Sequence, residues 1–309
     1  TLSVVNVLGA EEILKGVVPS EIFATAPTEA LKAQAVAARN HLLAQLGTRH
    51  HGQPYHLCGQ QHCQVYTGLK RRHQRTDEAV NSTAGQVLFH SGQLVHATYS
   101  STCGGFTENK EVVWGGEPDP ALKAKPDFDS AHDPALIPFV NGIQGKRFEA
   151  WLKINPKSFC AQGSTGKTSK VRWHRHFDHS QIQKITSAQH TDIGSLMDIS
   201  VTDRGPGGRA IGLRLTGSKT SHMVLMELPI RRLFNNLPSG SFIIDTQKDK
   251  QGKIINLNFH GAGWGHGVGM CQLGAIGRAK AGQGYRRILH HYYNGAQLKK
   301  IYEQHTPSP

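Results

Sequence analysis

Residues 260–275, HGAGWGHGVGMCQLGA, are the stretch of the sequence that most constrains the fold. Glycine occupies every second position from 261 to 269. Each glycine loses more backbone entropy on folding than any other residue, so the interior of a regular helix or strand does not favour this density. We therefore expect residues 260–275, named here the glycine segment, to have a backbone that another group approaches closely.

The chain has 309 residues, of which 38% are hydrophobic, so it can bury the core of one large domain or of two lobes. No run of 18 or more apolar residues is present, and we expect no membrane-spanning helix. The first residues lack the basic start and the cleavage site of a signal peptide. The cellular location must therefore be inferred from other features.

The chain is basic, with 35 Lys and Arg against 22 Asp and Glu and a formal net charge of +13. A surface of this charge attracts polyanions, either nucleic acid or an acidic cell-wall polymer, although it can also be simply solvated. The basic residues are scattered and are not interleaved with aromatic residues, and no nucleic-acid-binding motif is present. We expect no nucleic-acid partner.

Helical and strand patterns occur in separate parts of the chain. A helix is predicted from Pro27 to Gly47, and a shorter one over 9–17, ended by Pro19 and followed by a turn that holds Glu21. From about residue 84 onward, a hairpin and a later meander alternate apolar and polar residues. This separation of helical and strand patterns along the chain predicts a mixed α+β fold rather than alternating βαβ units.

We expect a single unit over 1–309 with two lobes. Residues 1–130 plus 255–309 would form the catalytic lobe, and 131–254 an inserted β-rich lobe, with a cleft between the two.

The five cysteines are too few, in a chain of this length, for a disulfide framework. The stretch HHGQPYHLCGQQHCQVY at 50–66 places thiol and imidazole groups at spacings that suit Zn²⁺, which prefers four nitrogen or sulfur ligands. A Cys58–Cys63 disulfide or plain buried thiols are the alternatives. The expected ligands of a structural zinc are Cys58, Cys63 and His62, with His51, His56 and Cys103 competing for the remaining position.

Three separated parts of the chain resemble the stage II sporulation protein D (SpoIID) family. They are ILKGVVPSEI with EALKAQAVAAR, then HLCGQQHCQVYTG with YSSTCGGFTEN, then GWGHGVGMCQLGA with GYRRILHHYYNGAQL. Together they cover residues 11 to about 130 and 258 to 302, whereas the middle of the chain matches only loosely.

The resemblance implies a lytic transglycosylase that cleaves the glycan of peptidoglycan outside the cytoplasm, with Glu21 as the catalytic acid. One carboxyl group would protonate the leaving oxygen and then take a proton from the 6-hydroxyl of MurNAc, leaving a 1,6-anhydro end. A hydrolase would need a second carboxylate, for which Glu108 and Glu111 are the nearby candidates. Apolar neighbours would raise the pKa of Glu21, although it can also be a helix-start carboxylate stabilised by the dipole.

The glycine segment could let backbone groups approach a glycan, with Trp264 stacking on a sugar and His266 binding a hydroxyl. Tight packing with Trp264 in the core is the alternative, and a Cys271 nucleophile beside His266 is a further one. The expected substrate-binding residues are Gln34, Arg39, Trp264, His266, Gly267 and Gln272.

The resemblance also favours metal in the 50–66 region, because some members of the family hold zinc there. Peptidoglycan glycan strands are the expected partner, and a cell-wall amidase is a second candidate. The alternative function is a non-catalytic module that binds cell-wall glycan and stimulates an N-acetylmuramoyl-L-alanine amidase, as some relatives of the family do.

Overall fold

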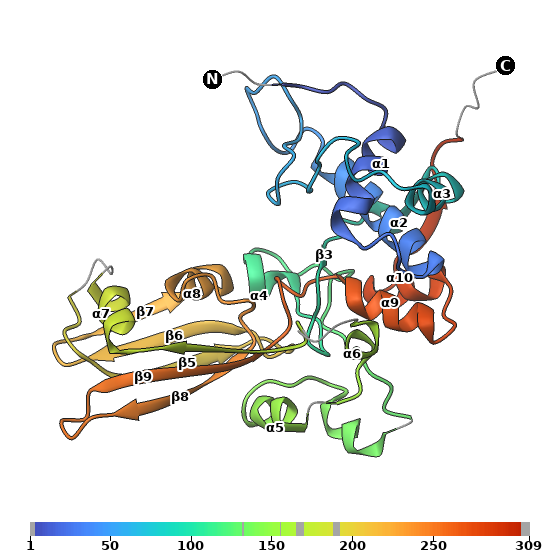
Figure 1. Ribbon diagram of the computed structural model, residues 1–309. Coiled ribbons are helices and arrows are strands. Elements are labelled where there is room, and N and C mark those ends of the chain that lie inside the picture. The colour runs from blue at the N-terminus through green and yellow to red at the C-terminus, as the bar shows by residue number, and fades with distance from the viewer. Residues whose placement is uncertain (1–3, 132, 155, 165–169, 188–191, 304–309) are drawn as a thin grey trace. The chain divides into compact units, whose positions relative to one another are not determined.

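The computed structural model describes residues 4–131, 133–154, 156–164, 170–187 and 192–303 (Figure 1). The chain divides into two compact units, which are considered separately below. Unit 1 comprises 1–99 and 275–309, and unit 2 comprises 100–274. These boundaries differ from those of the lobes expected from the sequence, and the expected cleft between lobes stays a prediction.

Unit 1 is built on a long buried helix, α2, at Thr28–Gln45. Its buried residues occur on every side of the helix, because α1 (Ala10–Glu21), α3 (Gln74–Ser82) and α10 (Tyr285–Tyr292) all pack on it. The alanines of α2 let these helices approach closely. The prediction of this helix is confirmed, including its start after Pro27.

The predicted end of the first helix at Pro19 is wrong, because α1 continues through Pro19 to Glu21. The Ser20 hydroxyl donates a hydrogen bond of 2.8 Å to the carbonyl oxygen of Gly16 within the same helix. The N–H of Ile22 then closes the helix on the carbonyl of Val18 at 3.0 Å. Glu21 is therefore the last residue of a helix and not part of a turn.

A three-stranded antiparallel sheet completes unit 1, with β1 (Gln86–His90) between β2 (Gln93–Leu94) and β11 (Gln297–Lys300). The predicted β1–β2 hairpin is confirmed. Its two turn residues, Ser91 and Gly92, both have positive φ (49° and 81°), as a two-residue hairpin turn requires. The chain leaves this sheet toward β3 (Tyr99–Ser100), which pairs with β10 (Met270–Cys271).

Unit 2 contains two three-stranded antiparallel sheets, shown by their long strands in Figure 1. One has the order β4–β9–β8 (Arg172–Phe177, Ile254–Ala262, Phe242–Lys248). The other has the order β5–β6–β7 (Leu196–Arg204, Ala210–Gly217, Ser221–Leu225). Helices α7 (His179–Ser187) and α8 (Glu227–Leu233) pack on the strands, and one apolar core around Phe259 joins both sheets.

The rest of unit 2 has short helices and irregular loops around a second core that contains Trp151, Phe128 and Phe139. Its helices are α4 (Lys110–Trp114), the 3₁₀ helix η1 (Pro134–Phe139), α5 (Lys146–Ile154) and α6 (Phe159–Gly163). Helix α9 (Gln272–Lys280) begins at the end of the glycine segment.

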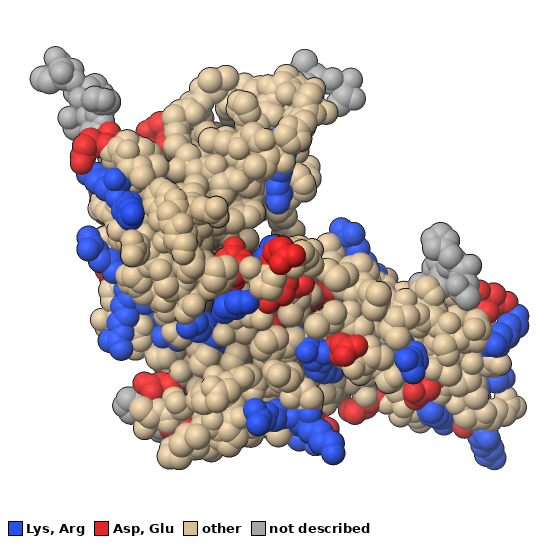
Figure 2. Space-filling view, turned by 180° about the vertical axis from the view of Figure 1, so that it is seen from behind, with Lys and Arg blue, Asp and Glu red and all other residues tan. Residues whose placement is uncertain are grey.

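The predicted mixed α+β class is confirmed by this combination of helices and small sheets. None of the helices in the described part of the chain is both long and apolar enough to cross a bilayer. On the face shown in Figure 2, Lys and Arg are dispersed among Asp and Glu and do not form one continuous stripe. A concentrated polyanion-binding stripe is not visible on this face.

Candidate functional site

Glu21 lies at the C-terminal end of α1, partly buried, and its Oε1 accepts a hydrogen bond of 2.9 Å from the backbone N–H of Val65. Burial raises the pKa of Glu21 above the usual 4.5, and the Val65 N–H lowers it by less. The negative end of a helix dipole also disfavours a carboxylate. The alternative of a helix-start carboxylate stabilised by the dipole is therefore wrong, and the environment suits a general acid.

The loop that carries Val65 packs directly along α1. A Cβ on Gly16 would lie 2.6 Å from Cε2 of the Tyr66 ring, so only glycine allows this close contact. The hydroxyls of Ser20 and Thr67 are 3.2 Å apart, which adds a polar contact one residue from Glu21. The loop is thus held against the helix on the side where the carboxyl lies.

Tyr99 is a further ionisable neighbour of Glu21 within unit 1. Its hydroxyl donates a hydrogen bond of 2.7 Å to Oε1 of Gln64, the residue before Val65. Burial, and then the charge of Glu21, raise the pKa of Tyr99 well above its usual value. Tyr99 therefore stays a neutral donor near the carboxyl. The sequence reasoning missed Val65, Tyr66 and Tyr99, although QVYTG directly follows the predicted metal ligands.

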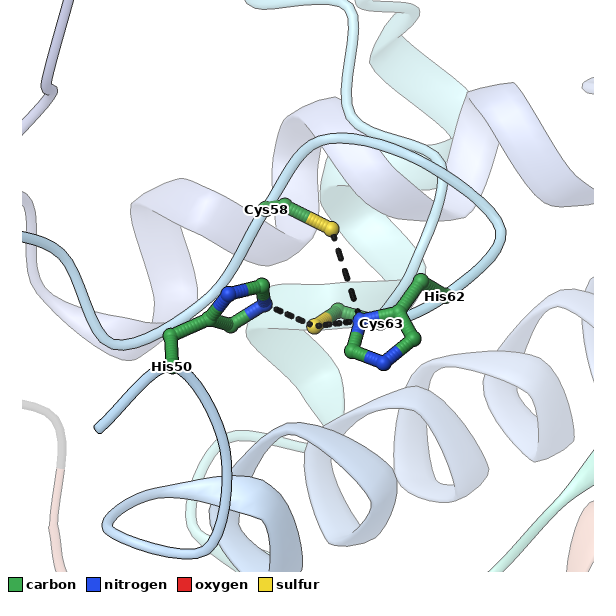
Figure 3. Close-up of side chains that lie close together, drawn as sticks. All are labelled: His50, Cys58, His62 and Cys63. Carbon is green, nitrogen blue, oxygen red and sulfur yellow. Dashed lines mark hydrogen bonds between the residues drawn. The ribbon is translucent and has the colours of Figure 1, made fainter. Parts of the chain in front are cut away.

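Four side chains of the same loop region point toward one another in Figure 3: His50, Cys58, His62 and Cys63. Their ligand atoms all lie within 4.8 Å of one another. Nδ1 of His62 is 3.8 Å from Sγ of Cys58 and 3.6 Å from Sγ of Cys63, and Nε2 of His50 is 3.3 Å from Sγ of Cys63. Two thiols and two imidazoles form a common donor set of structural zinc sites, so the residues present fit the metal.

The structure changes the predicted ligand set at one position. His51 is exposed and lies outside the group, and the adjacent His50 occupies the place expected for it. His50 has φ of 55°, a left-handed conformation that residues other than glycine rarely adopt. This backbone turn directs the His50 ring into the group. Of the two other competitors, the exposed His56 also lies outside the group, and Cys103 belongs to a separate cluster in unit 2.

Arg39 and Gln34 are both completely buried within unit 1. Nε and Nη2 of Arg39 each donate to the Glu11 carboxylate at 2.7 Å, and Nη1 donates to the Gln86 carbonyl at 3.1 Å. These bonds join α2 to the start of α1 and to β1. Arg39 therefore has a structural role within unit 1, and substrate contact by Arg39 or Gln34 stays a prediction that their burial does not support.

Trp264, in the glycine segment of unit 2, is 38% exposed, so the alternative that places it in the core is wrong. Its backbone pairs with Thr102, and Nζ of Lys170 lies 5.3 Å from its ring centroid. The half-buried His266 has its ring 4.8 Å from that of Trp114, and its Nδ1 accepts a hydrogen bond of 3.1 Å from the Val268 N–H. Both residues keep the partial exposure that their predicted role needs.

The glycines of this segment are explained by close contacts inside unit 2. A Cβ on Gly267 would lie 2.0 Å from Nη2 of Arg209, and one on Gly261 would lie 2.1 Å from the Trp173 ring. Gly267 itself is buried and donates its N–H to the Ser100 hydroxyl at 3.2 Å. The group that approaches the Gly267 backbone is thus a side chain of the protein, and substrate binding by Gly267 stays a prediction.

Three further polar groups considered from the sequence are buried: Gln272, Cys271 and Glu108. Gln272 is 8% exposed at the start of α9, and Cys271 is fully buried, which excludes a nucleophile open to substrate in this structure. Glu108 is also fully buried and accepts hydrogen bonds from the backbone N–H groups of Gly207 and Arg209. Glu111 pairs with Lys123 at 3.3 Å. Both carboxylates are thus engaged by other groups of unit 2.

Two family models match the chain. One, described as stage II sporulation protein (SpoIID), matches residues 1–90, which include Glu21 and the four residues of Figure 3. The other, described as a domain of unknown function (DUF8618), matches residues 108–269.

Three curated relatives are similar over nearly the whole chain. An uncharacterized protein of Brachyspira hyodysenteriae is 26% identical over 298 residues, covering 96% of this chain and 68% of that protein. The Amidase enhancer of Bacillus subtilis is 32% identical over 298 residues, covering 92% of this chain but only 40% of that protein. Stage II sporulation protein D of Bacillus subtilis is 27% identical over 310 residues, covering 94% of this chain and 74% of that protein.

Proposed function

The chain belongs to the SpoIID family, and we propose that it is a lytic transglycosylase that cleaves peptidoglycan glycan between MurNAc and GlcNAc outside the cytoplasm. The observation that carries the proposal is Glu21, a partly buried carboxyl of raised pKa whose Oε1 is held by the Val65 N–H. A raised pKa keeps the proton on the acid nearer to neutral pH, as proton donation to a leaving oxygen requires.

In the proposed reaction, Glu21 first donates its proton to the glycosidic oxygen as the bond from that oxygen to C1 of MurNAc breaks. The resulting carboxylate then accepts the proton of the 6-hydroxyl of the same MurNAc, whose oxygen forms the new bond to C1. The proton returns to Glu21, and no water is consumed. The Val65 N–H holds one carboxyl oxygen through both steps and so keeps the carboxyl group oriented.

The pairing of other acids in unit 1 supports a mechanism with one carboxyl group. Glu11 is bound to Arg39, Glu12 to Lys15, and Glu29 to the Tyr285 N–H and Lys32. A hydrolase needs a second carboxyl within roughly 5 to 9.5 Å of the first to activate water or to act as nucleophile. These acids are already engaged in ion pairs, which favours the anhydro product.

We further propose that a zinc ion held by His50, Cys58, His62 and Cys63 stabilises the loop beside Glu21. Cys63 is two residues before Val65, and its backbone carbonyl also lies 3.0 Å from Nε2 of His41 on α2. When bound, the ion would supply structural cross-linking and no chemistry of the reaction. The chain's own contribution is the orientation of the Val65 N–H toward Glu21.

A second candidate function is supported by one of the relatives, which is named Amidase enhancer and is 32% identical to this chain. In this case the protein would bind glycan strands and stimulate a cell-wall amidase without cleaving glycan. The two functions differ in whether Glu21 must donate and accept a proton.

Digestion of purified peptidoglycan by the full chain, followed by mass spectrometry, tests the proposal. We expect muropeptides lighter than the hydrolysis products by one water, with no ¹⁸O incorporated from labelled solvent. Reducing ends that carry solvent oxygen would make the protein a hydrolase. Glycan binding without any cleavage, together with faster release of stem peptides when an amidase is added, would favour the second function.

A further inference from the structure

Three of the five cysteines gather around a carboxylate in unit 2, whereas the residues shown in Figure 3 belong to unit 1. Cys103 follows β3, Asp127 lies in the loop after α4, Cys160 is in α6, and Cys271 ends β10. All four are buried, with exposed fractions of 3% or less, and their ligand atoms lie within 4.8 Å of one another. Residues far apart in the sequence thus bring four metal-ligating groups to one point.

The distances agree with a tetrahedral site. With Zn–S distances of about 2.3 Å and a Zn–O distance of about 2.0 Å, neighbouring ligand atoms lie about 3.5 to 3.8 Å apart. Sγ of Cys103 is 3.5 Å from Oδ2 of Asp127. A modest contraction of the remaining contacts around an ion would complete the tetrahedron.

Backbone N–H groups donate hydrogen bonds to sulfur and oxygen atoms of this cluster. Sγ of Cys271 accepts backbone N–H bonds from Cys103 and Gly274, both at 3.2 Å, and Oδ2 of Asp127 accepts one from Cys160 at 3.1 Å. Backbone donors of this kind stabilise thiolates and carboxylates rather than thiols.

A buried cation also lies beside the cluster. The guanidinium of Arg172 interacts electrostatically with Cys160 and Cys103. Its Nη1 donates to the carbonyls of Gly104 and Val171, whereas its Nε and Nη2 are buried without a hydrogen-bond partner among the described residues. An ion with three thiolates and one carboxylate has a net negative charge, which this guanidinium would offset.

We propose that Cys103, Asp127, Cys160 and Cys271 bind a second, structural zinc ion in unit 2. Zinc suits a set of three sulfur ligands and one oxygen ligand, and a closed set of four leaves no open position for water or substrate. A disulfide between two of the cysteines would use only two of the four groups, whereas a metal ion would use all four. The proposal does not rest on the function of Glu21.

The proposed ion would fasten a part of unit 2 that has little regular structure. It would tie the loop at 103, the loop at 127 and α6 to the glycine segment, in a region otherwise held by short helices and irregular backbone. A Cβ on Gly263 would lie 2.9 Å from the carbonyl carbon of Cys103, so the segment already passes close to one ligand. Metal binding would add folding free energy where the core is small.

The metal content of the purified full chain tests the proposal. We expect about two zinc ions per chain in the wild type, and about one in the Cys58→Ser/Cys63→Ser double variant, which keeps only the second site. Asp127→Asn in the double variant should lower the remaining zinc, whereas Asp198→Asn, a control at an exposed ion pair, should not. Zinc K-edge X-ray absorption of the double variant should show three sulfur neighbours and one oxygen.

A folded double variant without metal would overturn the proposal, as would a mass lower by two hydrogens that locates a disulfide among Cys103, Cys160 and Cys271. If the double variant does not fold, the wild type decides the question. Two zinc ions with an average of more sulfur than nitrogen neighbours support the second site. One zinc ion per chain with equal numbers of sulfur and nitrogen neighbours contradicts the second site.

Discussion

The loop region 50–67 of unit 1 and the glycine segment of unit 2 are both prominent in the sequence, but they are prominent for opposite reasons. The first is defined by side chains that can bind something, and the structure gathers four of them around one point. The second is defined by missing side chains, and the structure fills that space with Arg209 and Trp173. Ligand types therefore indicate chemistry directly, whereas glycine indicates close approach without revealing what approaches.

The largest expected effect lies beside the loop region, at Glu21. Glu21→Gln keeps the size of the side chain but removes the titrating proton, so glycan cleavage should fall by ~10² or more. The matched control is Glu12→Gln on the same helix, where the ion pair of the exposed Glu12 with the buried Lys15 is lost and cleavage should be unchanged. Release of anhydro-muropeptides per unit time is the measurement. Cleavage that survives in Glu21→Gln would exclude this carboxyl as the acid.

The glycine segment should respond through stability. Gly267→Ala places a Cβ against the buried Arg209 guanidinium at a φ of 71°, and overlap plus backbone strain should lower the free energy of unfolding by about 3 kcal/mol. Gly52→Ala in the loop region is the control, because its φ is 79° but no atom lies within 4 Å of the added Cβ. It should cost only about 1 kcal/mol.

Denaturant unfolding of the two glycine variants measures this difference. Equal losses would mean that Arg209 moves aside easily, and the close packing assigned to the segment would then be incorrect.

The next prediction concerns the choice between two adjacent histidines. His50→Ala removes a proposed zinc ligand and should weaken zinc binding by at least ~10-fold, because even partners outside the ligand set typically matter that much. His51→Ala removes an exposed ring outside the group and should leave affinity unchanged. Competition with a chromophoric chelator measures both. The reverse order of effects would restore His51 as the ligand.

Local patterns predicted much of the structure. The helix from Thr28, the β1–β2 hairpin and the grouping of Cys58, His62 and Cys63 depend on residues near one another in the chain, and each was predictable. The continuation of α1 through Pro19 was not, because proline usually ends a helix and here the loop with Tyr66 packs along it.

Contacts between distant residues were the part that the sequence could not indicate. From the sequence, Arg39 was expected to be accessible to substrate. In the structure it is fully buried and bound to Glu11, which lies 28 positions away. Cys103 and Cys271 are 168 positions apart and no spacing rule joins them. The Val65 N–H that holds Glu21 belongs to the backbone, which carries no sequence signal at all.

The smallest expected effect separates a catalytic Glu21 from a structural one. Because burial raises its folded-state pKa, the folded chain binds more protons at Glu21 than the unfolded chain in the window between the usual 4.5 and the raised value. The contribution of Glu21 to stability is therefore complete below that window and is lost as the pH rises through it. Gln cannot ionise and has no such loss.

Glu21→Gln should consequently match the wild type in melting temperature near pH 4 and exceed it slightly near pH 7, with the difference appearing across that window. Melting curves of both proteins over this range, with Glu12→Gln as the control, provide the measurement. A carboxyl kept for structure would give the opposite sign at pH 7, because the Val65 N–H would lose a charged acceptor. If Glu21 is the catalytic acid, its replacement by Gln should therefore raise stability at pH 7 and abolish cleavage, because burial destabilises the ionised carboxylate that proton transfer needs.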